Sequence, residues 1–366
     1  MRFDTIDGIR GHLLLGMMVA HLAFSSGTQE SLHHLLNLHH FRLIGMYDAE
    51  FFVPISGFMM GFLFRNKWHS DNHKLRQFLW VRTVKVYKYQ MLCALPVLLL
   101  IGFNGGIVEW FHSALAKLGA IVVLQAGFSY ADILPIYLSC FVILTIPCML
   151  GWTSRVIPFA VYCLSIYLMG QLLWFHNLRF IAFDVLSWSL LFNIFFVAGM
   201  YRQEIIQLCN RITLSVRLIL VVLFSMIWIS IWQLELYPEV LTHLPRKPNS
   251  SWARTQLNPA YLLMILSFVT VFVLILTYRG KNPLLTWPQK AMTFYFNLPF
   301  LKHIGRQSLK MFVAHVFIIN GYILLLKHTQ MPLQLPAAYV SIVLFLCFAY
   351  RHSIYNSMPI LQSRSA

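Results

Sequence analysis

Ten apolar segments, each about as long as a bilayer-spanning helix, constrain this chain more than any other feature. The hydrocarbon core of a bilayer is about 30 Å thick, and a helix of about 20 apolar residues crosses it. Charged residues make up 11% of the chain, whereas a soluble domain has about 25%. The sequence therefore predicts an all-α fold, a polytopic membrane helix bundle that forms a single domain over residues 1–366. The expected transmembrane helices lie near residues 6–25, 47–64, 89–106, 132–150, 157–174, 184–201, 214–233, 258–278, 307–326 and 334–350.

The distribution of basic residues predicts the orientation of this bundle. The side that holds the N-terminus carries 21 of the Lys and Arg residues, and the other side carries 7. Cytoplasmic loops of membrane proteins carry the excess of Lys and Arg, so both termini are expected in the cytoplasm. This rule accounts for the net charge of +16 without nucleic acid as a partner. A cytoplasmic site for a polyanionic cofactor is the alternative interpretation of the same charges.

Three stretches between the segments are expected at the membrane interface. Residues 75–90 alternate basic and aromatic side chains, which predicts an amphipathic helix on anionic lipid headgroups. Residues 107–124 hold three ionisable residues and are expected at the outer interface or as a re-entrant piece. A full span there would reverse every later segment and remove the charge bias. Residues 279–306 are expected to form a cytoplasmic loop that dips into the interface.

Several other motifs favour plain structural interpretations. No pair of the six cysteines has CxxC spacing, so the cysteines are expected to be packing residues. The loop 26–46 carries two His-His pairs that resemble a metal site only loosely, and a solvated loop is the favoured interpretation. Asp4 and Asp7 lie where a signal peptide would have basic residues, which argues against a cleaved leader.

The first apolar segment carries ionisable residues that a bilayer disfavours. Asp7 and Arg10 are three residues apart and therefore neighbours on one helical face. His21 follows Arg10 by eleven residues on the same face, about 16 Å further along the helix. With Arg10 at the cytoplasmic boundary, His21 would lie near the middle of the bilayer. Ionisable residues at such positions indicate a functional site.

The second segment begins with two carboxylates, Asp48 and Glu50, and continues to Ser56. It enters from the opposite side, so Glu50 would approach His21 if the first two helices are neighbours. The sequence thus predicts a histidine within reach of a carboxylate in a dry site. Such a pair can be a general base for acyl transfer to a hydroxyl, a proton relay in a transporter, or part of a metal site. Ligand number and spacing support the metal poorly.

Further polar residues lie in or at the ends of other segments. Asp132 and Asp184 begin inward-running helices, and a helix N-cap is the favoured interpretation of Asp184. His315 is a second histidine inside an apolar segment, and a satisfied core residue is its alternative interpretation. Together with Arg10, these residues predict a polar cavity that opens outward.

Four stretches of the chain are similar, in combination, to one known family. They are Asp-x-x-Arg-Gly with a later His in 7–21, Asp-Ala-Glu-Phe-Phe-Val-Pro-Ile-Ser-Gly-Phe in 48–58, Asp-Ile-Leu-Pro-x-Tyr in 132–137, and Gly-Arg-Gln-Ser-Leu with Phe312 in 305–312. The chain resembles the OpgC-type family, named for succinyl transfer to osmoregulated periplasmic glucans. This family is placed within the acyltransferase family three superfamily of integral membrane acyltransferases. The 48–58 stretch has one residue fewer than the family's pattern.

Two stretches depart from the pattern of that family. Residues 183–192 lack the Asn, Pro and Gln of the family's Phe-Asn-Pro-Phe-x-Trp-Gln-Leu-Leu-Phe. The family's Lys-Thr-x-Leu appears as Arg-Thr-Gln-Leu in 254–257. Both stretches lie where an acceptor would bind.

The resemblance implies an acyl-CoA-dependent O-acyltransferase of the bacterial inner membrane. It would move an acyl group, succinyl or acetyl, from cytoplasmic acyl-CoA to a hydroxyl of a periplasmic or cell-envelope glycan. The implied partners are acyl-CoA as donor substrate, the glycan acceptor and the lipid bilayer, with no permanently bound cofactor, no metal and no nucleic acid. The sequence indicates no oligomeric state.

Residue roles follow when the resemblance is combined with the residues themselves. His21 would be the general base, and Glu50 or Asp48 would orient its imidazole and stabilise the charged form. Arg10, held by Asp7, would contact the phosphates or the acyl carboxylate of the donor. Asp132 and Tyr137 are candidate sugar contacts. The predicted substrate-binding residues are Asp7, Arg10, Ser56, Asp132, Tyr137, Ser308 and His315.

A transporter or flippase for a sugar or lipid-linked glycan is the rival function, because it would use the same buried polar groups. Such a protein should have paired broken helices in two related halves, and the sequence shows no such pair. A structural membrane protein is a third class, and it would not need His21 and Arg10 on one helical face.

Overall fold

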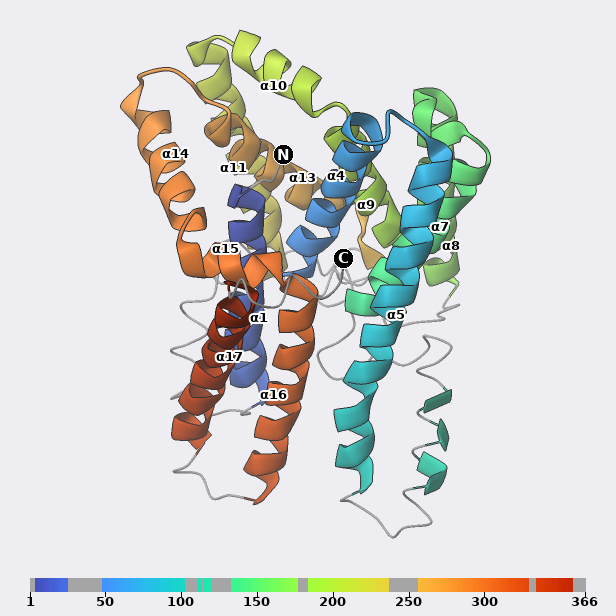
Figure 1. Cartoon of the computed structure of the whole chain (residues 1–366). Coiled ribbons are helices and arrows are strands. Elements are labelled where there is room, and N and C mark those ends of the chain that lie inside the picture. The colour runs from blue at the N-terminus through green and yellow to red at the C-terminus, as the bar shows by residue number, and fades with distance from the viewer. Residues whose placement is uncertain are drawn as a thin grey trace.

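The computed structural model describes residues 4–25, 48–102, 111–113, 115–116, 118–119, 133–176, 184–236, 256–328 and 334–357. Within these ranges every regular element is a helix (Figure 1), so the all-α prediction is confirmed. The helices are α1 (Asp4–Ser25), α4 (Ala49–Asn66), α5 (Asn72–Gly102), α7 (Ile133–Met149), η1 (Trp152–Ser154), α8 (Val156–Phe175), α9 (Val185–Met200), α10 (Arg202–Arg211), α11 (Leu214–Leu236), α13 (Pro259–Leu276), α14 (Pro283–Phe296), α15 (Pro299–Arg306), α16 (Ser308–His328) and α17 (Gln334–Ser357).

Several of these helices have the length and composition of membrane spans. Four described helices are long and apolar enough to cross a membrane: α8, α11, α13 and α16. The number rises to five if α9 and α10, which meet at an angle of 75°, form one span. Residues 133–149 and 336–350 are apolar but shorter. The total of about ten spans and the cytoplasmic side of both termini stay predictions.

Helix α5 differs from the sequence prediction. The stretch 75–90 and the segment 89–106 were expected as two elements, but they form one helix of 31 residues, about 46 Å long. Leu75, Leu79 and Val86 are buried at intervals of four and seven residues, as on one face of a helix. The basic residues of this stretch therefore belong to a helix that also packs into the core.

The stretch 279–306 is also helical, although a loop was expected there. Asn282 caps the start of α14 by accepting a hydrogen bond from Leu284 N at 2.9 Å, and Pro283 occupies the first turn. Pro299 likewise occupies the first turn of the short helix α15, which has no side-chain cap. Figure 1 shows α15 crossing the middle of the molecule between α14 and α16. This stretch is therefore part of the packed fold.

Helix α15 crosses α1 with the two backbones in contact. A Cβ atom at Gly11 would lie 1.9 Å from the carbonyl oxygen of Leu301, and one at Gly305 would lie 1.7 Å from that of Asp7. Glycine permits such an approach because it has no side chain. Helix α1 also packs against α16 and α17 (Figure 1), so the first residues of the chain meet the last helices.

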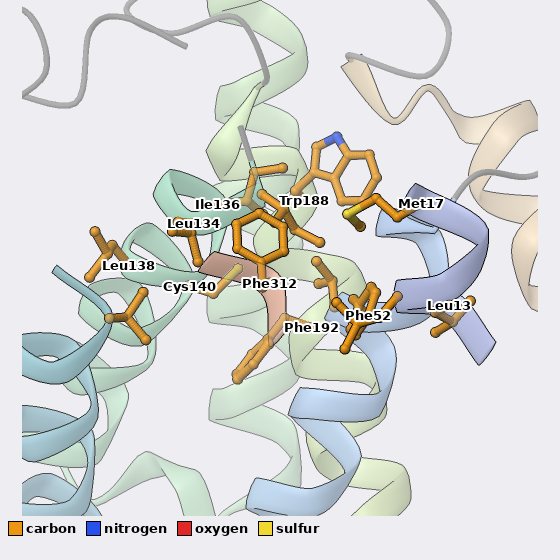
Figure 2. Packing of buried hydrophobic residues seen from close by; sticks show 14 of the residues in the cluster. Leu13, Met17, Phe52, Leu134, Ile136, Leu138, Cys140, Trp188, Phe192 and Phe312 are labelled. Carbon is orange, nitrogen blue, oxygen red and sulfur yellow. The ribbon is translucent and has the colours of Figure 1, made fainter. Parts of the chain in front are cut away.

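A second close crossing joins α4 to α9. A Cβ atom at Gly61 would lie 1.8 Å from the carbonyl oxygen of Phe196, and one at Gly199 would lie 2.0 Å from that of Phe58. Near this crossing, apolar side chains of α1, α4, α7, α9 and α16 converge (Figure 2). The core thus fixes the position of α9 relative to α1, α4, α7 and α16, and these four helices carry most of the predicted site residues.

Candidate active site

A cavity of about 200 Å³ lies between α1, α4, α5, α7 and α16. Most of its lining is apolar, with Leu14, Phe52 and Met60 among the lining residues. Its polar lining comprises Arg10, Ser56, Arg82, Tyr137 and Ser308. Four of these five residues were predicted to bind substrate, and each comes from a different helix.

The polar groups of this cavity interact with one another. Ser56 Oγ donates a hydrogen bond to Tyr137 Oη at 3.2 Å, which joins α4 to α7. Arg10 is close enough to Tyr137, Asp7 and Arg82 to interact with each electrostatically. Among the described residues that line the cavity, two are arginines and none is acidic. Two like charges on one apolar cavity favour an anionic ligand.

Arg82 was missed as a site residue, because the sequence placed it on an interfacial helix. It follows Leu79 by three residues and precedes Val86 by four, so it lies on the same face of α5 as these buried residues, although its own side chain is exposed. An arginine spaced in register with the apolar residues of an amphipathic helix was the available signal. Arg82 is itself exposed and Arg10 is half-buried, so solvent reaches the cavity where these two arginines lie.

The two carboxylates at the start of α1, Asp4 and Asp7, pair with basic residues of α15. Arg306 Nη2 lies 3.2 Å from Asp4 Oδ1, and Arg306 Nε lies 3.7 Å from Asp7 Oδ2. Lys302 Nζ lies 3.5 Å from Asp4 Oδ2. The hydrogen bond from Arg306 holds the pKa of Asp4 below its usual value. Asp7 is therefore close to Arg306 as well as to Arg10. Only Arg10 was predicted as its partner.

The two predicted histidines form a pair away from the cavity lining. His21 Nδ1 lies 2.7 Å from His315 Nε2, and the ring centroids are 4.9 Å apart. His315 is fully buried, and its Nδ1 lies 3.3 Å from the carbonyl oxygen of Phe312. The structure therefore gives His21 an imidazole partner, which the sequence analysis did not propose.

The predicted acidic partner, Glu50, is fully buried and accepts a hydrogen bond from Tyr261 Oη at 2.7 Å. Tyr261 was missed, although Asn258 and Pro259 mark the helix start that places it in the first turn of α13. Asp48 is buried at the N-cap of α4, where its carbonyl oxygen accepts from Phe52 N at 2.9 Å. The pairing of Glu50 or Asp48 with His21 stays a prediction.

The remaining predicted residues have separate outcomes. Asp184 is the N-cap of α9 and accepts a hydrogen bond from Leu186 N at 3.1 Å, so the capping interpretation is confirmed. Asp132, the His-His loop 26–46 and most of 107–124 lie outside the described residues. Across the part of the chain that the structure describes, no three His, Cys, Asp or Glu side chains are grouped to hold a metal ion.

The model of one protein family, described as OpgC protein, matches residues 2–357. The chain belongs to the OpgC family. The match includes every residue of the cavity and of the imidazole pair, and the family's name points to a transferase with a glucan succinyltransferase-like role. Neither the comparison with curated proteins nor the comparison with solved structures gives a match. OpgC membership and the apolar helices together indicate a membrane protein.

Proposed function

We propose that this OpgC-family protein is a membrane O-acyltransferase. It moves an acyl group, succinyl or acetyl, from cytoplasmic acyl-CoA to a hydroxyl of a periplasmic or cell-envelope glycan. The observation that carries the proposal is the apolar cavity with two arginines, from which α1 and α16 extend to the imidazole pair. Placement in the acyltransferase family three superfamily, as the resemblance implies, is part of the same proposal.

The donor is assigned to the cavity because acyl-CoA is anionic and the cavity lining carries two arginines. Arg10 and Arg82 would bind a phosphate or an acyl carboxylate, and a planar guanidinium contacts such a group through two hydrogen bonds. The hydroxyls of Ser56, Tyr137 and Ser308 supply further hydrogen-bonding groups for polar atoms of the substrates.

The acyl transfer itself is assigned to His21. In this step His21 accepts the proton of the acceptor hydroxyl, and the hydroxyl oxygen forms an ester bond with the thioester carbonyl carbon. The carbon–sulfur bond breaks, and the proton passes from His21 to the leaving thiolate, so CoA leaves as the thiol. A positioned general base of this kind accelerates such a step by about 10²–10⁴-fold.

The proposed topology places Arg10 toward the cytoplasm in a bacterial inner membrane, with both termini on that side. Membrane-impermeant labelling of single cysteines at positions Asn249 and Ser363 tests it. The two labels should react from opposite sides of the membrane. Labelling from the same side would overturn the arrangement in which donor and acceptor enter from different faces.

The activity is tested with purified protein in lipid nanodiscs, supplied with radiolabelled succinyl-CoA or acetyl-CoA and a periplasmic glucan fraction. Label should appear in the glucan. Arg10→Lys should lose most of this transfer while it folds normally, since an ammonium group cannot make the paired contacts of a guanidinium. Arg65→Lys is the matched control, because Arg65 pairs with Glu204 at 2.5 Å outside the cavity lining.

The rival function gives a different result in the same material. A transporter or flippase would move a sugar or lipid-linked glycan across proteoliposomes without consuming acyl-CoA. Glycan movement without acyl transfer in the wild type, lost in His21→Gln protein, would replace the proposal with the transporter.

A further inference from the structure

The hydrogen bonds of the two histidines determine which ring nitrogens carry protons, a point that the proposed function leaves open. His315 lies on α16 with no solvent-exposed surface, between His21 and the backbone of its own helix. Its Nε2 is 2.7 Å from His21 Nδ1. Its Nδ1 is 3.3 Å from the carbonyl oxygen of Phe312. Both nitrogens of this ring therefore have a hydrogen-bond partner.

The carbonyl partner decides which nitrogen of His315 carries a proton. A carbonyl oxygen only accepts hydrogen bonds, so Nδ1 of His315 must be the donor. In a neutral imidazole one nitrogen donates and the other accepts, so Nε2 of His315 is the acceptor. The hydrogen bond between the two rings must then come from an N–H at Nδ1 of His21. In this tautomer the lone pair of His21 is on Nε2.

We propose that His315 is a positioning residue that fixes His21 in the Nδ1-protonated tautomer, so that Nε2 is the basic nitrogen. This inference rests on the proposed function, in which His21 is the base. The partner of a catalytic histidine commonly sets its tautomer and ring orientation through the nitrogen that does not react. Here the partner is a neutral ring held by a backbone carbonyl.

Helix geometry links this pair to the cavity. Arg10 and His21 are eleven residues apart on α1, and Ser308 and His315 are seven apart on α16. Arg10 of α1 and Ser308 of α16 both line the cavity, and His21 of α1 contacts His315 of α16. The packing that forms the cavity wall therefore also sets the distance between the two rings.

Two substitutions at His315 separate positioning from packing. His315→Phe keeps an aromatic ring but has no acceptor, and should lower kcat for acyl transfer by about 10²–10⁴-fold, the scale of general-base catalysis. The KM for acyl-CoA should change less than threefold, because His315 does not line the cavity. His315→Gln places an amide oxygen near the position of Nε2 and should retain activity within about tenfold of the wild type. His303→Gln is a matched control. His303 lies on α15, and its Nε2 is 2.9 Å from the carbonyl oxygen of Ala349 on α17.

The tautomer is also measurable without any substitution at His315. In ¹⁵N-histidine-labelled protein, the signals of His21 are identified by their loss in His21→Gln. Those signals should show the proton on Nδ1 and an unprotonated Nε2 in the wild type.

Two outcomes would overturn the inference: a proton on Nε2 of His21, or a folded His315→Phe protein with near-wild-type kcat. Equal losses in folded His315→Phe and His315→Gln would also do so, because packing would then explain both. Failure of the proposed function looks different, since a fully active His21→Gln protein removes His21 as the base whatever its tautomer.

Discussion

Arg10 and His21 lie on the same helix, yet their surroundings differ in kind. Arg10 belongs to a solvent-accessible cavity that five helices line with charges and hydroxyls. His21 belongs to a pair of rings whose second member is fully buried and whose contact is one short hydrogen bond. An anionic group is attracted by charges from several directions, whereas proton transfer needs one nitrogen in a fixed protonation state. The two regions therefore suit different steps of one reaction, donor binding and proton transfer.

The largest effect is expected at the histidine end. His21→Gln should lower kcat by about 10²–10⁴-fold and leave the KM for acyl-CoA nearly unchanged, because the base is lost and the cavity is intact. Initial rates over a range of acyl-CoA concentrations separate the two constants. His12→Gln is the control on the same helix, since His12 Nδ1 contacts Tyr295 Oη at 2.9 Å outside the cavity. A raised KM with unchanged kcat would merge the two regions into one binding site.

A smaller effect of the opposite kind is expected at the cavity end. Arg82→Gln should raise the KM for acyl-CoA by about 10–100-fold with little change in kcat, since a hydrogen bond to a charged group contributes about 1.5–3 kcal/mol. The KM of the wild type should also rise with salt, because Arg82 is exposed. Arg76→Gln, on the same helix but outside the cavity lining, is the control. A KM of Arg82→Gln equal to that of the control would remove Arg82 from the donor site.

The carboxylate of Glu50 is expected to act together with the histidine end. Glu50→Gln should lower acyl transfer, and the double variant with His21→Ala should be scarcely worse than His21→Ala alone, because the effects of residues that act as one unit are not additive. Losses that multiply as for independent sites would instead separate Glu50 from His21.

Tyr261→Phe removes the hydrogen-bond donor to Glu50 and should cost about 1–3 kcal/mol of stability, measured by thermal unfolding in detergent.

The smallest effect is expected at the start of α1. Arg306 holds the pKa of Asp4 below its usual value, so the carboxylate adds stability at neutral pH that is lost as the pH falls through that lowered pKa. Asp4→Asn should lower the midpoint of thermal unfolding slightly at pH 7, and the difference from wild type should disappear in acid. Turnover should stay near the wild-type value. A loss of turnover as large as that of Arg10→Lys would show that this ion pair belongs to the donor site.

The sequence by itself determined the class of fold and the positions of most polar site residues. The recurrence of apolar segments requires helices in a membrane, because each backbone group must find its partner within the segment. The spacing of Asp7, Arg10 and His21 places them on one face of α1, since helical periodicity is a local property. The family resemblance, carried by short motifs, agrees with the match over residues 2–357.

Only the tertiary structure decided which of these residues meet. His21 and His315 are 294 positions apart, and Tyr261 is 211 positions from Glu50, so no local pattern relates them. Arg82 joined the cavity because α5 is continuous and turns its buried stripe toward the other helices. The glycine contacts between α1 and α15 bring Arg306 to Asp4 and Asp7. Side-chain partners depend on how helices cross, and the crossings are set by packing between distant segments, which periodicity within one segment does not encode.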